Sequence, residues 1–230
     1  MHRFKLLILL VTITVSFCRA QYPFNNPSLP VDKRVHDLLD RLTTEEKISL
    51  LLYNSPGVER LGIPAYNWWN EALHGVGRAG RATVFPQAIG MAATFNEALI
   101  KEVGTVISNE ARAKYNIAVK NYNRGQYLGL TFWSPNINIF RDPRWGRGHE
   151  TYGEDPFLTG KISASFVKGL QGDDPRYYKT VACAKHFAVH SGPEPVRHEF
   201  NAIVSNNDLH NTYLPAFKKL ITEAKVGGVM

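Results

Sequence analysis

Three stretches of the sequence join charged side chains to aromatic ones in a way that suits the binding of a polar ligand. They are YNWWNEALHGVG at residues 66–77, FRDPRWGRGHETYGEDP at 140–156, and CAKHFAVHSGPEPVRHEF at 183–200. Aromatic rings offer a flat apolar face, and an arginine beside them can hold hydroxyl groups in fixed geometry. The chemistry that these residue types favour is therefore recognition of a sugar.

The middle stretch is highly charged, but its charges nearly cancel. Four carboxylates oppose three arginines, which leaves a net charge of −1: Asp142, Glu150, Glu154 and Asp155 against Arg141, Arg144 and Arg147. A polyphosphate site needs uncompensated cations, so this count excludes nucleic-acid binding here. Most of these charges suit a solvated surface loop equally well, and Asp155 is typical of a helix cap. Trp145-Gly146-Arg147 is different, because a solvated loop gains little from tryptophan, and we interpret Trp145 as a candidate stacking face.

The first stretch contains two adjacent tryptophans, Trp68 and Trp69, followed by Glu71 and His74. Adjacent tryptophans occur in protein cores as often as in ligand platforms, so both interpretations stay open. The carboxylate that follows so closely favours the lip of a binding site, with Trp68 and Trp69 as further candidates for stacking.

The third stretch places Lys185 and His186 directly after the apolar residues 181–184, and Arg197 on the loop that follows. A strand ending there would present these side chains at its C-terminal end, and an unpaired buried ammonium group would be costly. Zinc is an alternative, since His186 and His190 are four residues apart. The residue after His186 is not the glutamate that such helical zinc sites use, however, and the prolines that follow prevent a continuous helix. Loss of activity of the complete protein with a chelator would support zinc.

The elements that must position these residues follow from apolar periodicity. Short apolar runs predict strands at residues 131–140, 180–189 and 226–230. Helical patterns are expected at 35–42, 43–52, from Asn96 (with Leu99, Val103, Val106 and Ile107 inward), at 155–172, and from about Asn207. This alternation predicts an α/β fold with a parallel sheet, either a barrel or a doubly wound sheet. The charged loops after the strands favour a (β/α)8-type barrel with its site at the strands' C-terminal ends.

The N-terminus reads as a targeting segment. In residues 1–20, a cationic start precedes an apolar run from Leu6 to Phe17 and a cleavage site at Cys18-Arg19-Ala20, which together predict a signal peptide. Cleavage would leave 24 basic against 20 acidic residues, which gives no case for a nucleic-acid or membrane partner. We expect a secreted or periplasmic protein with an extended lead-in at residues 21–32.

The motifs NEALHGV, RDPRWGRGHETYGEDP, and KHF followed by an arginine together resemble glycoside hydrolase family 3, in its β-xylosidase-like branch. The resemblance covers about Asp32 to Met230 and implies an N-terminal barrel domain over residues 33–230. It implies a retaining, exo-acting β-glycosidase that acts on an oligosaccharide and needs no metal or organic cofactor. It also implies a set of residues that bind the hydroxyls of the terminal sugar: Glu71, Arg147, Lys185, His186 and Arg197.

The β-glucosidases of this family usually have aspartate where this chain has Glu71. The longer side chain, beside Trp68 and Trp69, favours a pentose and hence a β-xylosidase of plant-wall oligosaccharides. A β-glucosidase of the same family and a non-catalytic sugar-binding remnant are the alternatives. The family's nucleophile and acid/base have no counterpart before Met230, and the sequence stops in an apolar run. We therefore expect an incomplete barrel that is inactive alone and belongs to a longer protein.

Overall fold

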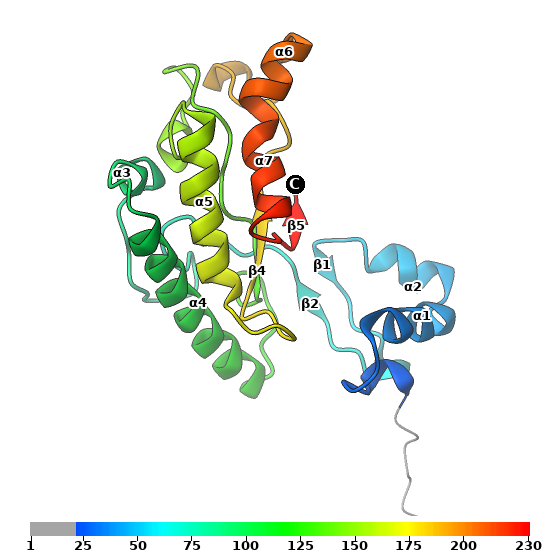
Figure 1. Ribbon diagram of the computed structural model, residues 1–230. Coiled ribbons are helices and arrows are strands. Elements are labelled where there is room, and N and C mark those ends of the chain that lie inside the picture. Colours follow the sequence, from blue (N-terminus) through cyan, green and yellow to red (C-terminus); the bar gives the residue numbers. More distant parts are fainter. Residues whose placement is uncertain (1–21) are drawn as a thin grey trace, which may run out of the picture. The chain divides into compact units, whose positions relative to one another are not determined.

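The computed structural model describes residues 22–230 (Figure 1). The signal peptide predicted for residues 1–20 lies outside the described residues. The chain divides into two compact units, one that ends at Ile48 and one that comprises Ser49–Met230. All three stretches singled out from the sequence lie in the second unit.

The first unit packs a short turn against a helix. The 3₁₀ turn η1 (Pro23–Asn25) precedes α1 (Val31–Arg41). The Phe24 backbone N–H donates to Asp37 Oδ2 over 3.1 Å, and Arg34 Nε donates to the Phe24 carbonyl over 2.8 Å. The predicted extended lead-in at residues 21–32 is therefore wrong in part, because these bonds fold it onto α1.

The predicted capping box at the start of α2 (Thr44–Ser49) is confirmed. The Thr43 N–H donates to Glu46 Oε2 over 2.8 Å, and the Glu46 N–H donates to Thr43 Oγ1 over 3.2 Å. The helix ends earlier than expected, because the chain turns after Ser49 and the carbonyls of Leu50 and Leu52 accept from the Ser55 hydroxyl.

The second unit contains two small sheets. Strands β1 (Asn54–Ser55) and β2 (Tyr66–Asn67) are antiparallel. Strands β3 (Thr131–Phe132), β4 (Val181–Ala184) and β5 (Gly228–Val229) form a parallel sheet in the order β3-β4-β5. The predicted parallel arrangement is confirmed within these strands, which are shorter than the apolar runs that predicted them. Residues 134–139 stay buried after β3, but they form mainly isolated hydrogen bonds to the segment beside them. One example is the bond from the Ile137 N–H to the Lys185 carbonyl, over 2.8 Å.

Helices pack beside this sheet, with α4, α5 and α7 lying next to one another (Figure 1). The helices of this unit are α3 (Ala88–Ala92), α4 (Glu97–Lys120), α5 (Pro156–Gln171), α6 (Asn206–Asp208) and α7 (Leu214–Thr222). Shorter turns are the 3₁₀ turns η2 (Glu59–Leu61), η3 (Gly148–Glu150) and η4 (Glu194–Val196), and the π-helical turn η5 (Leu209–Tyr213).

Helix α5 follows its predicted signals closely. Asp155 caps it by accepting from the Leu158 N–H over 2.6 Å, Pro156 is its first residue, and Gly172 follows its end. Its close approach to α4 depends on Gly169, where a Cβ atom would overlap the Lys101 carbonyl oxygen. Replacement of this glycine would force the two helices apart.

One predicted inward position on α4 is wrong. Leu99 is 42% exposed, and its neighbour Ile100 is completely buried instead. The buried face of α4 continues from Ile100 through Val103 and Ile107, so the helix is rotated relative to the pattern that included Leu99.

The described residues therefore form a mixed α/β fold, and their parallel strands do not close into a barrel. Among the helices of residues 22–230, none has both the length and the apolar character needed to cross a bilayer.

Candidate functional site

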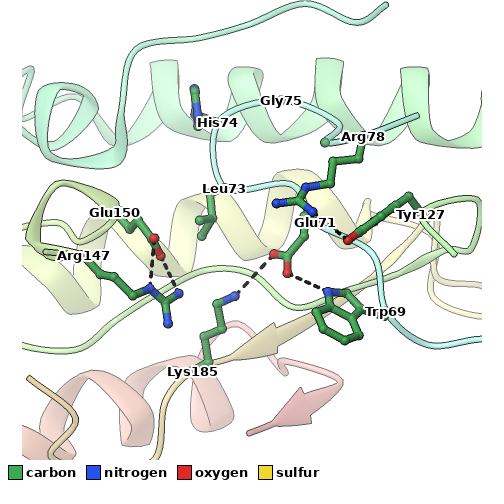
Figure 2. A pocket seen from close by; sticks show the side chains of 11 residues that line it. Trp69, Glu71, Leu73, His74, Gly75, Arg78, Tyr127, Arg147, Glu150 and Lys185 are labelled. Carbon is green, nitrogen blue, oxygen red and sulfur yellow. Dashed lines mark hydrogen bonds and ion pairs between the residues drawn. The ribbon is translucent and has the colours of Figure 1, made fainter. Parts of the chain in front are cut away.

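A pocket of about 390 Å³ lies where the segments that follow β2, β3 and β4 meet (Figure 2). Glu71 comes from the segment after β2, Arg147 and Glu150 from the long segment after β3, and Lys185 from the end of β4. The lining residues are Trp69, Glu71, Leu73, His74, Gly75, Gly77, Arg78, Tyr127, Arg147, Glu150 and Lys185. The pocket thus joins residues from all three stretches that predicted a site, together with Arg78 and Tyr127 from outside them.

Lys185 and Glu71 form the central ion pair of the pocket. Lys185 Nζ lies 3.4 Å from Glu71 Oε2, and Lys185 is only 4% exposed. Glu71 Oε1 accepts a second hydrogen bond from Trp69 Nε1 over 3.1 Å. Burial lowers the pKa of the Lys185 amine, and the negative charge of Glu71 opposes that shift. The buried ammonium group of Lys185 is therefore paired with the carboxylate of Glu71, as expected from the cost of burying an unpaired charge.

Arg147 and Glu150 form a second, bidentate pair in the same pocket. Arg147 Nε donates to Glu150 Oε1 over 3.0 Å, and Arg147 Nη2 donates to Oε2 over 2.6 Å. Burial alone would raise the pKa of the Glu150 carboxyl, but the hydrogen bonds and the charge of Arg147 outweigh it and leave that pKa below its ordinary value. Glu150 is therefore held ionised.

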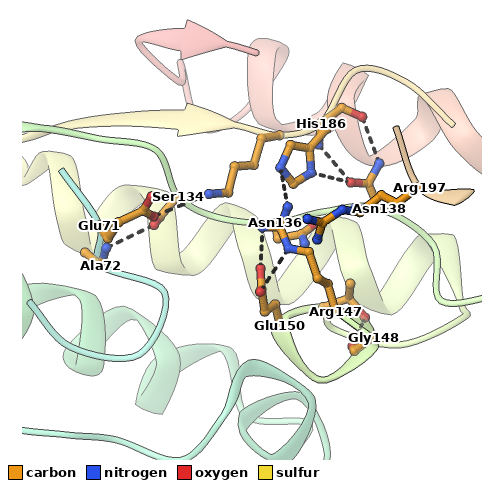
Figure 3. A network of polar contacts seen from close by, with 12 residues as sticks. Glu71, Ala72, Ser134, Asn136, Asn138, Arg147, Gly148, Glu150, His186 and Arg197 are labelled. Atoms are coloured by element: carbon orange, nitrogen blue, oxygen red, sulfur yellow. Dashed lines mark hydrogen bonds and ion pairs between the residues drawn. The ribbon is translucent and has the colours of Figure 1, made fainter. Parts of the chain in front are cut away.

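His186 adjoins the pocket through Arg147 (Figure 3). Its Nδ1 lies 2.8 Å from Asn138 Oδ1, and its Nε2 lies 3.2 Å from Arg147 Nη1. A carbonyl oxygen only accepts and a guanidinium only donates, so we assign the proton to Nδ1 and leave Nε2 as an acceptor. Burial, followed by the positive charge of Arg147, lowers the pKa of His186 to about 3. The imidazole is therefore neutral at ordinary pH.

Arg197, the fifth predicted hydroxyl ligand, lies beside this group rather than in the wall of the pocket. It pairs with Glu194 at 2.9 Å. Its positive charge also contributes to the low pKa of His186. Glu71, Arg147 and Lys185 are thus brought together directly, and His186 and Arg197 border them.

The three tryptophans predicted to stack on a sugar have different environments. Trp69 lines the pocket and stacks on Trp133 with ring centroids 5.0 Å apart. Trp68 is 43% exposed, does not line the pocket, and donates its Nε1 proton to Ser55 Oγ. Trp145 is only 2% exposed and contacts the rings of Phe140 and His190. The predicted stacking role of Trp145 is therefore wrong, because the side chain is almost fully buried and offers no exposed face to a ligand.

Several residues of the site were missed in the sequence. Glu150 was counted only as a loop charge, although its position three residues after Arg147 is a spacing that lets the two side chains meet within one turn. Asn138 was read as part of an apolar strand, although a buried asparagine in such a run signals a specific hydrogen-bonding task. Arg78 and Tyr127, which share a 3.2 Å hydrogen bond in the pocket wall, carried no recognisable signal.

A metal centre finds no support in the part of the chain that the structure describes. No group of three or more His, Cys, Asp or Glu side chains lies close enough there to hold an ion. Both ring nitrogens of His186 already have protein partners.

Comparisons with known proteins identify the family of this chain. Residues 39–230 match the Glycosyl hydrolase family 3 N terminal domain. The chain is 53% identical over 213 residues to the xylan 1,4-beta-xylosidase of Xylanibacter ruminicola, covering 90% of this chain and 25% of the relative. It is 48% identical over 223 residues to beta-D-xylosidase 3 of Arabidopsis thaliana, with 90% and 28% covered.

Solved structures show the same likeness. A GH3 exo-beta-xylosidase (XlnD) bound to a xylobiose aziridine probe superimposes with a TM-score of 0.80 at 38% identity, covering 90% of this chain and 28% of the other. A GH3 beta-glucosidase of Bifidobacterium adolescentis gives 0.70 at 30%, with 84% and 26% covered. This chain spans about a quarter of the length of these relatives. It belongs to glycoside hydrolase family 3, whose N-terminal domain it carries.

Proposed function

We propose that this chain supplies the sugar-binding part of an exo-acting, retaining β-glycosidase, and that the complete enzyme is a β-xylosidase of plant-wall oligosaccharides. The observation that carries the proposal is the pocket in which the buried Lys185–Glu71 pair, Arg147 and the indole of Trp69 converge. An aromatic face beside fixed charged donors and acceptors suits a ring with several hydroxyls. The family match over residues 39–230 spans every residue that lines this pocket.

The two carboxylates of the pocket, Glu71 and Glu150, are not the reacting pair. A retaining glycosidase needs a nucleophile and an acid/base about 5 to 5.5 Å apart, one of which must carry a proton. Glu150 is held ionised by Arg147, and Glu71 is bound to Lys185 and Trp69. Both reacting groups would therefore come from the part of the enzyme that corresponds to the remaining length of its relatives. That part would also complete a (β/α)8-type barrel. The predicted signal peptide would direct the enzyme to a secreted or periplasmic location. The reaction would need no cofactor.

Substrate preference gives the direct test of this function. We expect the complete enzyme to cleave an aryl β-xyloside with a higher kcat/KM than the matching β-glucoside, because Glu71 occupies space that the glucoside's hydroxymethyl group would need. Glu71→Asp, which shortens the side chain by one methylene, should narrow that ratio about tenfold. Steady-state kinetics on both substrates measure it. Faster cleavage of the glucoside by the wild type would favour the β-glucosidase alternative. The similarity of this chain to the Bifidobacterium beta-glucosidase structure is the observation behind that alternative.

The two adjacent tryptophans allow a matched comparison. Trp69→Phe and Trp68→Phe each remove one indole N–H, but only Trp69 donates to the pocket carboxylate Glu71. We expect Trp69→Phe to lower kcat/KM about tenfold, the order of a hydrogen bond to a charged group, and Trp68→Phe to change it less than about twofold. Thermal melting of both variants controls for folding. Equal losses in the two variants would contradict the assignment of Trp69 to the site.

A further inference from the structure

The orientation of the Arg147 guanidinium is set on two sides by protein groups. Glu150 accepts from Nε and Nη2, and His186 Nε2 accepts from Nη1. A guanidinium has five N–H groups, so these three bonds leave two N–H groups, one on each terminal nitrogen. Those two are what Arg147 can offer to neighbouring hydroxyls.

The backbone places Glu150 for this contact. The 3₁₀ turn η3 brings Glu150 one turn after Arg147, and the Glu150 N–H donates to the Arg147 carbonyl over 3.0 Å. Gly148 lets the turn pack on the Phe140 ring, because a Cβ atom there would overlap the ring. The two side chains are 23% and 17% exposed, so solvent competes little for their hydrogen bonds.

We propose that Glu150 is a positioning residue: it holds Arg147 in the orientation that contacts both His186 and the substrate. Both of its carboxylate oxygens are bound to Arg147, so it acts through that residue and not on the sugar. A bidentate carboxylate fixes the plane of a guanidinium as well as its position, which a single acceptor would not do. This role rests on the proposed glycosidase function.

The kinetic test uses the complete enzyme and Glu150→Gln, which keeps the shape of the side chain and removes its charge. We expect kcat/KM on an aryl β-xyloside to fall about 10- to 100-fold, mostly through kcat, because contacts to the sugar hydroxyls tighten in the transition state. Glu154→Gln is the matched control: Glu154 belongs to the same stretch, is exposed, and makes no ion pair among the described residues. It should change kcat/KM less than about twofold.

A double-mutant cycle separates positioning from general stabilisation. If Glu150 acts through Arg147, then Glu150→Gln added to Arg147→Ala should lower kcat/KM less than about twofold further. The same loss in both backgrounds, or no loss in the wild-type background, would overturn the proposal. Glu150→Asp, which keeps the charge at a shorter reach, should lie between wild type and Glu150→Gln and provides the test if the latter does not fold.

A crystal structure of the complete Glu150→Gln protein tests the proposal without relying on activity. We expect Arg147 Nη1 to move out of hydrogen-bonding distance of His186 Nε2, and an unchanged contact would overturn the proposal. A wild-type protein that cleaves no glycoside would refute the proposed function, whereas an active wild type with an unaffected Glu150→Gln variant would refute only this inference.

Discussion

Replacing Lys185 by methionine in the complete enzyme is expected to lower kcat/KM on an aryl β-xyloside by about 10²- to 10³-fold. Removal of one partner from a buried, hydrogen-bonded charge pair costs on this scale, because the other charge is left without compensation. Lys185 is almost fully buried, and Glu71 is its ion-pair partner. Methionine keeps most of the length and the apolar stem of lysine, so the loss reports the missing ammonium group more than a cavity.

The matched control for this variant is Lys101→Met. Lys101 pairs with Asp173 at 3.0 Å, but its side chain is exposed, and exposed pairs contribute little. We expect this variant to keep kcat/KM within about twofold of wild type. Thermal melting curves show whether Lys185→Met still folds cooperatively. A folded Lys185→Met variant with nearly normal turnover would remove Lys185 from the site.

The sequence predicted the elements whose signals are local. Asp155, Pro156 and Gly172 marked the ends of α5, and Thr43 with Glu46 marked the start of α2, because caps depend on residues a few positions apart. The strands were predicted in the right places but too long. After β3, residues 134–139 stay buried, yet much of their hydrogen bonding goes to side chains and isolated backbone contacts that periodicity does not reveal.

The site could be predicted as a set of residue types but not as a network. Lys185 and Arg147 stood out because their charges lay next to apolar or aromatic residues, and the pocket contains both. The pairings Lys185–Glu71 and Arg147–His186 join residues 114 and 39 positions apart, which a single sequence does not encode locally. The stacking role predicted for Trp145 was wrong because its burial depends on tertiary packing. The rings that contact it, Phe140 and His190, lie 5 and 45 positions away in the sequence.

Replacing Asn138 by aspartate is expected to give the second large effect, a loss of activity that depends on pH. Asn138 Oδ1 accepts from both the backbone N–H and the Nδ1–H of His186, and its Nδ2 donates to the His186 carbonyl over 2.8 Å. Aspartate would keep the acceptor but add a negative charge beside the imidazole. An opposite charge at this distance raises a histidine pKa by about one to three units.

The direction of the effect follows from the present state of His186. Burial first, and then the charges of Arg147, Lys185, His190 and Arg197, lower its pKa to about 3, so the wild-type imidazole stays neutral through the acid range. In Asn138→Asp the ring would gain a proton on Nε2 as the pH falls through about 4 to 6. Nε2 would then be a donor facing another donor, Arg147 Nη1, and the contact between them would be lost.

We therefore expect kcat/KM of Asn138→Asp to lie about 10²-fold below wild type on the acid side and to recover in part above neutral pH. The acid limb of its pH profile, where activity falls with decreasing pH, therefore moves to higher pH. Asn138→Ala is the comparison variant: it removes all the hydrogen bonds of the Asn138 side chain without adding charge, and it should lower activity at every pH without moving the limb. Identical pH profiles for the two variants would mean that Asn138 only packs against His186. A shifted limb confined to the aspartate variant would mean that the site depends on a neutral imidazole, held by Asn138 at one ring nitrogen and by Arg147 at the other.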